Sequence, residues 1–362
     1  MKLRQLLILL FSTFLLQSVN AQVVKNVVIE KYTSARCGNC PRGTELLKDL
    51  VKDKDNIIWL SHHVDWIPDQ MQLDELSPMY DDFAGSAPRA SFDRVHFDGA
   101  NRVAVRPNMW AERLETQLDE SAYVDVAVHG GIVERDLYIN LEATFDTLPD
   151  ADDIRVTVFV VEDVVVGSGN GYDQRNYDNN NQNSLLYDKG DPILNYEHLN
   201  VTRAVITDLW GTAGIIPDSP EIGVPYMHQF TYTVPEEFDM TQLRVVALLN
   251  YYDDNVNNRS ILNAGQEYVN NFLSVGIDGL DISTFTTFPN PFLEQTFIEI
   301  ENLSDDAQLK VYNMNGQVVS VDYMIGSQGI TVKGNNVSAG TYLFQIIEAN
   351  GTVMGKGKWM IK

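Results

Sequence analysis

The sequence predicts an α/β domain followed by two all-β units, within a chain of 362 residues. Between residues 22 and 120, apolar strand-like runs alternate with segments of helical spacing, as in α/β domains. From 121 to 275 the apolar residues recur at every second position, which is typical of the strands of a β-sandwich. After a linker at 276–286, shorter alternating segments predict a small β-sandwich at 287–362.

The N-terminal segment 1–21 has the pattern of a secretory signal peptide. Lys2 and Arg4 form a positive start, an apolar run follows at 6–16, and Ala21 supplies a small residue at the expected cleavage site. We therefore expect the mature chain to begin after this residue and to be exported. The apolar run is too short to span a membrane and no other segment is long enough, so we expect no transmembrane segment.

The chain is strongly acidic, with a formal net charge of −24. It has no basic stripe to neutralise phosphates, which argues against nucleic acid and against anionic lipid surfaces as partners. We attribute the acidity to solubility after export. Loops rich in Asn and Asp at 172–183 and 253–258 offer oxygen ligands for calcium, but neither has EF-hand spacing. Calcium is therefore an alternative, and we expect no cofactor beyond a redox-active disulfide.

The α/β domain is expected to alternate strands with helices throughout. Its strands are short apolar runs, and its helices carry apolar residues three or four positions apart. Pro107 suits the first turn of the last helix, where the missing N–H costs little. In chain order the elements are expected at 26–32 (strand), 44–51 (helix), 57–64 (strand), 71–83 (helix), 89–95 (strand) and 107–118 (helix).

The two later units are expected to consist of alternating strands. Two polar loops, at 167–183 and 253–259, interrupt the second unit, and we interpret them as exposed connections. In the third unit Asn315–Gly316 is a hairpin signal. The strands are expected at 124–128, 137–141, 156–160, 201–206, 230–234 and 243–250, and then at 297–300, 309–312, 318–321 and 342–347.

Cys37 and Cys40 are the only cysteines of the chain and form a C-x-x-C pair between the first expected strand and the first expected helix. This placement is typical of a thioredoxin-like redox site. A helix N-terminus stabilises a thiolate, and the neighbouring Arg36 adds a positive charge, so we expect Cys37 to be the nucleophile. Cys40 is expected to be the resolving thiol.

Pro88 is the third expected catalytic residue. A thioredoxin-like site has a cis-proline loop that faces its cysteines and pairs with the substrate backbone. Ala87–Pro88 directly precedes the expected strand at 89–95, which matches that position, so we expect this peptide bond to be cis.

Two features depart from many thioredoxins. No tryptophan precedes Cys37, and Lys31 stands six residues before it, where a buried acid is usual. Glu30 is its neighbour, and strand alternation places the two on opposite faces, so only one of them can lie beneath the cysteines.

The C-x-x-C pair has two other interpretations. In the first interpretation the pair is a structural disulfide, although closing so short a loop contributes little to stability. In the second, both thiolates bind zinc together with His62 and His63, but adjacent residues of a strand point to opposite faces. We therefore expect both histidines to serve in strand packing. His198 is likewise expected to be a structural hydrogen-bonding residue.

The C-terminal residues resemble a type A sorting domain of the type IX secretion system. The resemblance covers about the last 75 residues and implies export across a Gram-negative outer membrane by the type IX secretion machinery. It depends on four ordered motifs, at 288–292, 311–317, 339–342 and 358–362.

A second resemblance is to the outer-membrane-protein-28-related family. It rests on the segments 29–51 and 195–211, and spans roughly residues 22 to 275. It implies a thioredoxin-like domain at 22–120 before a β-sandwich at 121–275, in a protein of the outer membrane or cell surface.

These observations predict an exported thioredoxin-like protein that exchanges disulfides with the thiols and disulfides of other exported proteins. In that reaction Cys37 attacks and Cys40 resolves the mixed disulfide. The alternative is a non-catalytic surface binding or adhesion protein, in which the thioredoxin-like fold is a scaffold and the C-x-x-C pair is a structural disulfide. Fold alone does not decide between the two.

Overall fold

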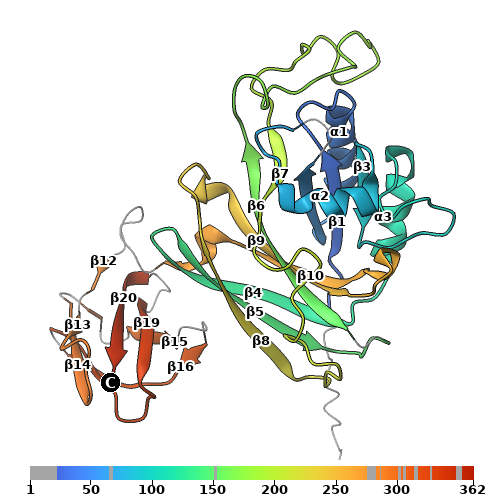
Figure 1. Cartoon of the computed structure of the whole chain (residues 1–362). Coiled ribbons are helices and arrows are strands. Elements are labelled where there is room, and N and C mark those ends of the chain that lie inside the picture. The colour runs from blue at the N-terminus through green and yellow to red at the C-terminus, as the bar shows by residue number, and fades with distance from the viewer. Residues whose placement is uncertain are drawn as a thin grey trace, which may run out of the picture.

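The computed structural model describes residues 23–64, 68–150, 153–274, 283–285, 287–300, 303–304, 307–313, 317–326, 328–347 and 353–362. Within them the protein is mostly β-structure arranged in several sheets, as expected in outline (Figure 1). The expected signal peptide at 1–21 lies outside the described residues. None of the described helices is long and apolar enough to cross a membrane.

The N-terminal unit consists of β1 (Val27–Thr33), α1 (Cys40–Val51), β2 (Ile57–His63), β3 (Arg89–Phe92), η3 (Pro107–Met109) and α3 (Trp110–Leu118). β1 pairs with β2 in parallel and with β3 antiparallel. The expected helix at 71–83 is instead a series of short turns that Gly85 ends with a φ of 63°. These turns are η1 (Asp74–Leu76), α2 (Ser77–Met79) and η2 (Tyr80–Ala84).

Side chains of β1 alternate between two apolar cores, as strand geometry requires. Ile29 belongs to the core beneath α1 and α3, whereas Val28 belongs to the core that includes η2. The same alternation points the side chains of Glu30 and Lys31 in opposite directions. Lys31 faces α1 and contacts its Thr44, and Glu30 lies in the opposite core.

One sheet continues from this unit into the next. β6 (Ile154–Val165), β7 (His198–Val205), β9 (Leu243–Tyr251) and β10 (Ile261–Tyr268) extend it to seven strands in the order β10-β9-β6-β7-β2-β1-β3. The link is the parallel pairing of β2 with β7, in which Ser61 lies opposite Val201. The expected boundary at residue 120 therefore does not separate two sheets.

A second sheet covers part of the first. It contains β11 (Leu273–Ser274), β4 (Val124–Val133), β5 (Asp136–Phe145) and β8 (Pro225–Thr233), in that order. Val126 and Leu141 of this sheet share an apolar core with Val158 and Val245 of the seven-stranded sheet. The alternating apolar pattern thus marks the inward faces of two sheets. The remaining short turns are η4 (Met240–Gln242), η5 (Val256–Asn258) and η6 (Val269–Asn271).

The C-terminal unit has its own apolar core, in which Trp359 stacks on Phe344 with ring centroids 4.7 Å apart. Its sheets have the orders β12-β20-β19-β15-β16 and β13-β14-β18-β17. Of the expected linker, Ser283–Thr284 already pairs with β20, and the hairpin signal at Asn315–Gly316 lies outside the described residues. The strands are β12 (Ser283–Thr284), β13 (Thr287–Phe288), β14 (Gln295–Glu299), β15 (Gln308–Asn313), β16 (Val318–Val319), β17 (Asp322–Gly326), β18 (Gly329–Lys333), β19 (Gly340–Ile347) and β20 (Val353–Ile361).

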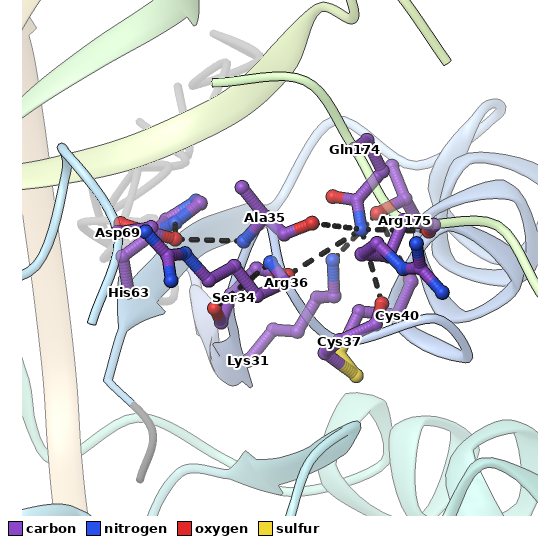
Figure 2. The surroundings of a disulfide bond; sticks show 11 residues. Lys31, Ser34, Ala35, Arg36, Cys37, Cys40, His63, Asp69, Gln174 and Arg175 are labelled. Atoms are coloured by element: carbon purple, nitrogen blue, oxygen red, sulfur yellow. Dashed lines mark hydrogen bonds and ion pairs between the residues drawn. A yellow bond between two sulfur atoms is a disulfide. The ribbon is translucent and has the colours of Figure 1, made fainter. Parts of the chain in front are cut away.

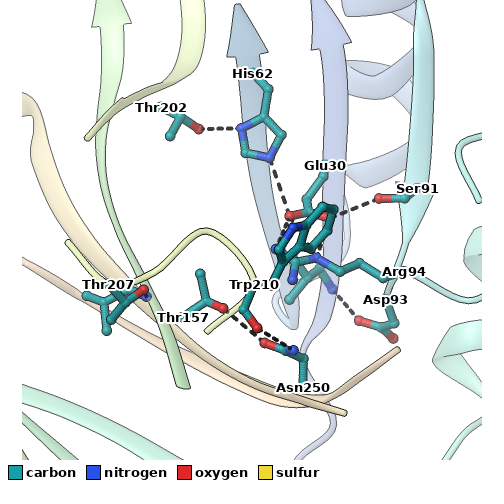
Figure 3. Close-up of polar contacts among 12 residues, drawn as sticks. Glu30, His62, Ser91, Asp93, Arg94, Thr157, Thr202, Thr207, Trp210 and Asn250 are labelled. Atoms are coloured by element: carbon teal, nitrogen blue, oxygen red, sulfur yellow. Dashed lines mark hydrogen bonds and ion pairs between the residues drawn. The ribbon is translucent and has the colours of Figure 1, made fainter. Parts of the chain in front are cut away.

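Glu30 and Arg94 form an ion pair in which both side chains are 0% exposed. Arg94 Nη2 lies 2.7 Å from Glu30 Oε1, and Arg94 Nε donates to Oε2 at 2.9 Å (Figure 3). His62 of β2 lies 3.3 Å from Oε1 and contacts Thr202 of β7 at 2.9 Å, while Ser91 of β3 donates to Oε2. Burial alone raises the pKa of Glu30, but Arg94 and His62 together hold it well below its usual range.

Arg94 reaches this position because β3 ends earlier than expected. The strand predicted at 89–95 stops at Phe92, and both Asp93 and Arg94 have positive φ angles, of 49° and 53°. Asp93 stabilises the turn by accepting a hydrogen bond from Val28 N at 2.8 Å and pairing with Lys25 at 2.9 Å. No local pattern in the sequence signals this turn.

We predict that Arg94→Met lowers the free energy of unfolding by about 3–5 kcal/mol, because it leaves the Glu30 carboxylate buried without its partner. Lys54→Met is the control, since it removes an ion pair to a largely exposed Glu115 and is expected to cost about 1 kcal/mol or less. Urea denaturation at pH 7 measures both. Equal losses in the two variants would show that the buried pair is not a special determinant of stability.

Candidate functional site

Cys37 and Cys40 form a disulfide at the N-terminus of α1 (Figure 2). The intervening turn is closed by the amide of Cys40, which donates to the carbonyl of Cys37 at 3.1 Å. Pro41 occupies the first turn of the helix, where no N–H is needed. Cys37 is 8% exposed and Cys40 is 0% exposed, so an incoming sulfur reaches the pair through Cys37.

Pro88 lies beside this helix. The Ala87–Pro88 peptide bond is cis, as the sequence predicted. A Cβ built at Gly43, one turn beyond the disulfide, would lie 3.2 Å from the Pro88 ring and 3.1 Å from Trp110. Glycine at this position therefore allows the proline loop to approach α1. The structure thus brings all three expected catalytic residues to the same end of α1.

A groove of about 380 Å³ runs between α1 and the proline loop. Asn39, which lies between the two cysteines, is part of its wall. The groove therefore borders both the C-x-x-C turn and the cis-proline, although neither cysteine lines it. It is lined by Asn39, Arg42, Gly43, Leu46, Ser86, Ala87, Pro88, Arg106 and Pro107.

Lys31, and not Glu30, lies beneath the cysteines. Its Nζ donates to Thr44 Oγ1 at 2.5 Å, and that hydroxyl contacts the carbonyl oxygen of Cys40 at 3.3 Å. Burial lowers the pKa of Lys31 to about 7, although Glu45 opposes this shift. The site therefore holds an amine that gains and loses a proton near neutral pH.

A long loop between β6 and β7 covers the C-x-x-C turn; we call residues 172–191 the covering loop (Figure 1). The side-chain amide of Gln174 donates to the carbonyls of Ala35 and Cys37, both at 3.0 Å (Figure 2). The amide of Tyr177 donates to the carbonyl of Gly38 at 2.9 Å. Its ring lies so close that a Cβ at Gly38 would be 2.3 Å from a ring carbon.

The interpretation of residues 167–183 as an exposed connection is wrong for the middle of that segment, because Gln174, Asn176 and Asp178 are buried. Asp178 fastens the covering loop to α1 by accepting two hydrogen bonds from Arg42, at 2.7 and 2.5 Å. The hydrogen bond from Arg42 lowers the pKa of Asp178, against the effect of burial. Ser184 donates a third hydrogen bond to the same carboxylate.

The oxygen-rich side chains of the covering loop therefore have partners in the protein itself. Within the described residues, no group of three or more His, Cys, Asp or Glu side chains has the geometry to hold a metal ion. Calcium binding at the two polar loops stays a prediction without a site that supports it.

A second polar cluster supports the C-x-x-C turn from behind. Asp69 accepts hydrogen bonds from the amides of Ala35 and Met71, at 2.7 and 2.8 Å, and lies 2.7 Å from His63 Nδ1. Burial raises the pKa of Asp69, but His63 and these amides hold it well below its usual range. Burial, aided by the nearby His63, lowers the pKa of His198 to about 3, so this histidine is neutral at physiological pH.

The histidines behave as the strand pattern predicts. His62 points to the Glu30 core and His63 to Asp69, so they do not converge on the cysteines. His198 contacts the carbonyl of Tyr172 at 2.7 Å and packs against His63. It is a structural residue that connects β7 with the start of the covering loop.

The chain matches the family model described as outer membrane protein Omp28 over residues 80–271, which is more than half of its length. The protein belongs to this family. A second model, a secretion system C-terminal sorting domain, matches residues 286–362. This Omp28-family protein is therefore exported to the outer-membrane surface or the extracellular space, and its sorting domain implies contact with the type IX secretion machinery.

Three solved structures are similar to the chain, and the first of them shares its fold. HBP35 of Porphyromonas gingivalis is 18% identical, with a TM-score of 0.53 over 94% of this chain and 99% of that one. A protein from Agrobacterium tumefaciens is 14% identical, with a TM-score of 0.45 over 72% of this chain and 100% of its own. A domain of the outer membrane lipoprotein Omp28 from P. gingivalis is 11% identical, with a TM-score of 0.25 over 42% of this chain and 90% of its own. No curated protein matches the chain.

The family match begins at residue 80, so it includes Pro88 and the covering loop but not the cysteines. The covering loop is the part of the site that the sequence did not reveal. Its density of Asn, Asp and Gly was visible, but nothing local indicated that Gln174 and Tyr177 reach the C-x-x-C turn.

We predict that Lys31→Met stabilises the protein most at low pH. Below about pH 7 Lys31 is charged in both states, and burying that charge costs about 2–4 kcal/mol. Between pH 7 and 10.5, the usual pKa of a lysine, Lys31 loses its proton in the folded state but keeps it in the unfolded state. The cost of burying the charge therefore falls as the pH rises. The stability advantage of Lys31→Met is therefore expected to shrink from pH 6 to pH 10.

Urea denaturation at several pH values measures this difference. Lys48→Met on α1 is the control, because Lys48 is exposed, and its difference from the wild type is expected to stay constant over this range. A constant difference for Lys31→Met as well would show that the amine is charged in the folded protein throughout.

We predict that Gln174→Ala accelerates reduction of the Cys37–Cys40 disulfide by dithiothreitol about five- to tenfold, because losing the amide contacts to the C-x-x-C turn loosens the covering loop. Timed alkylation and mass spectrometry measure the free thiols. Gln182→Ala is the matched control, since Gln182 is an exposed residue of the same loop. The idea that Gln174 restricts access fails if both variants react at the wild-type rate.

Proposed function

We propose that this protein exchanges disulfides with other exported proteins through Cys37 and Cys40. The observation that carries the proposal is the convergence of the cysteine pair, cis-Pro88 and buried Lys31 at the N-terminus of α1. A structural disulfide requires neither a proline loop beside it nor an amine with a pKa near 7 beneath it. The order β1-α1-β2 followed by an antiparallel β3 is the arrangement of a thioredoxin-like domain, which supports the proposal.

The exchange begins at the more exposed sulfur. A substrate thiolate attacks Cys37 Sγ, the Cys37–Cys40 bond breaks, and Cys40 leaves as a thiolate. A second substrate thiolate then attacks the substrate sulfur of the mixed disulfide, and Cys37 leaves as a thiolate. Two electrons pass from substrate to protein, and the substrate gains one disulfide. The reverse sequence reduces a substrate disulfide, and the thiol–disulfide couple of the compartment sets the direction.

Lys31 is the proposed proton partner of Cys40. As an ammonium it stabilises the departing thiolate or donates a proton to it, and as an amine it accepts the proton when Cys40 attacks in reverse. Its pKa of about 7 makes both forms available near neutral pH. Lys31 would thus perform the task of the acid that is usual at this position.

A second function has one observation in its favour. The covering loop holds the C-x-x-C turn at Ala35, Cys37 and Gly38, and Cys37 is only 8% exposed. This closure suits a surface binding protein in which the disulfide is structural. The two functions differ in whether the closed state opens to a thiol.

We predict that Cys40→Ser, produced in full-length form, forms mixed disulfides with exported proteins, because it retains the attacking Cys37 but lacks the resolving thiol. Cys37→Ser, which removes the exposed sulfur, is the control and is expected to form none. Non-reducing electrophoresis and mass spectrometry of the conjugates identify the partners. Exchange is also measured with the wild type in defined glutathione buffers.

Two results together would refute the enzymatic proposal. The first is a reduction potential below about −300 mV for the Cys37–Cys40 disulfide. The second is the absence of mixed disulfides with Cys40→Ser. That combination favours the structural disulfide of a surface binding protein.

A further inference from the structure

We propose that the groove beside Pro88 selects substrates whose exchanging cysteine is flanked by acidic residues. This inference rests on the proposed function and names the substrate class of the same site. It arises from an arginine cluster around the proline loop that local carboxylates do not neutralise.

The cluster consists of Arg89, Arg102 and Arg106. Arg89 Nε donates to Ser86 Oγ at 2.8 Å, and its Nη1 donates to the carbonyl of Ala104 at 2.8 Å. Arg102 donates to main-chain carbonyls of η2. Among the residues that the structure describes, none of these three arginines forms an ion pair with a carboxylate.

The three guanidinium groups also affect one another. Burial lowers the pKa of Arg89, and the positive charges of Arg106 and Arg102 lower it further. Their mutual repulsion is a cost that a bound anion would relieve. Arg106 is exposed and lines the groove itself, so a ligand in the groove can contact it directly.

The rest of the groove has the same sign of charge. Arg42 also lines the groove, with its guanidinium paired to Asp178, and no acidic residue lines the groove itself. The whole chain contains 50 acidic and 26 basic residues. The net charge of the protein repels acidic ligands at long range, so the attraction that we infer acts locally, between a bound carboxylate and Arg106.

The occupant we infer is an acidic polypeptide segment. The groove borders the C-x-x-C turn at Asn39, so a polypeptide segment bound in it can bring a cysteine of its own toward Cys37. Arg42 is already paired with Asp178, so the cationic partner that the described residues leave for a carboxylate beside that cysteine is Arg106. Leu46 and Pro107 provide apolar contacts in the groove.

The test compares three peptides of equal length, each with one central cysteine in a mixed disulfide and with flanks of Glu, Gln or Lys. The full-length wild-type protein, reduced beforehand, is expected to exchange with the Glu peptide about tenfold faster than with the Gln peptide at low salt. The Lys peptide is expected to be slowest. The preference is expected to fade as the salt concentration approaches 1 M, because ions screen exposed charges.

Arg106→Gln is expected to reduce the preference for the Glu peptide about threefold or more. The matched control is Lys310→Gln on β15, which removes one exposed positive charge in the C-terminal unit and is expected to retain the wild-type preference. Equal rates for the Glu and Gln peptides in the wild type overturn the inference. An equal loss in both variants overturns it as well, since net charge would then explain the preference.

Two further measurements separate this inference from the proposed function. Exchange with bis(2-hydroxyethyl) disulfide, which is uncharged, reports on the function alone. Binding of a cysteine-free Glu peptide, followed by fluorescence polarisation, reports on the groove alone. Binding that Arg106→Gln weakens supports the groove as a site for acidic segments even if no exchange occurs. The inference fails if the cysteine-free peptide does not bind, or if inorganic sulfate or a heparin fragment binds and the peptide does not.

Discussion

The fold depends on a charge that is buried where four strands meet. Glu30 on β1 contacts His62 on β2 and Ser91 on β3, and His62 continues the network to Thr202 on β7. A carboxylate inside an apolar core is tolerated only with full compensation, which Arg94 provides in a bidentate pair. The requirement to satisfy Glu30 therefore fixes the register of β1, β2, β3 and β7 relative to one another. It also explains why β3 gives way to a turn that aims Arg94 inward.

Lys31, the residue after Glu30, has a different environment because successive residues of a strand point to opposite faces. Glu30 and Lys31 differ by one position, and the pleat of β1 sends one into the core and the other toward the disulfide. Compensation keeps Glu30 charged, whereas Lys31 lacks a comparable partner and its pKa falls to about 7. The first arrangement suits a permanent charge that holds strands together. The second suits a group that gains and loses a proton.

The parts of the molecule that could be predicted from the sequence are those with local signals. A C-x-x-C at a strand–helix junction and a proline before a strand placed Cys37, Cys40 and Pro88 close to where the structure has them. The alternation of β1 predicted that only one of Glu30 and Lys31 lies beneath the cysteines, and the structure identifies it as Lys31. The pairing of β2 with β7 and the contacts of Gln174 had no such signal. Both join residues more than a hundred positions apart, the first through main-chain groups on both strands and the second through a side-chain amide that donates to main-chain carbonyls. The interpretation of a polar segment as an exposed connection failed for the same reason.

The parallel pairing of β2 with β7 also affects how the protein can be divided for study. A fragment that ended near residue 120 would carry the cysteines, the proline loop and Lys31, but it would lose β7 from the side of β2. That side of β2 would then present unpaired main-chain groups to other chains, a common origin of aggregation. It would also lack the loop that closes over the disulfide. The unit that carries the C-x-x-C pair therefore does not end near residue 120, and a fragment meant to retain its sheet has to extend to the end of β10.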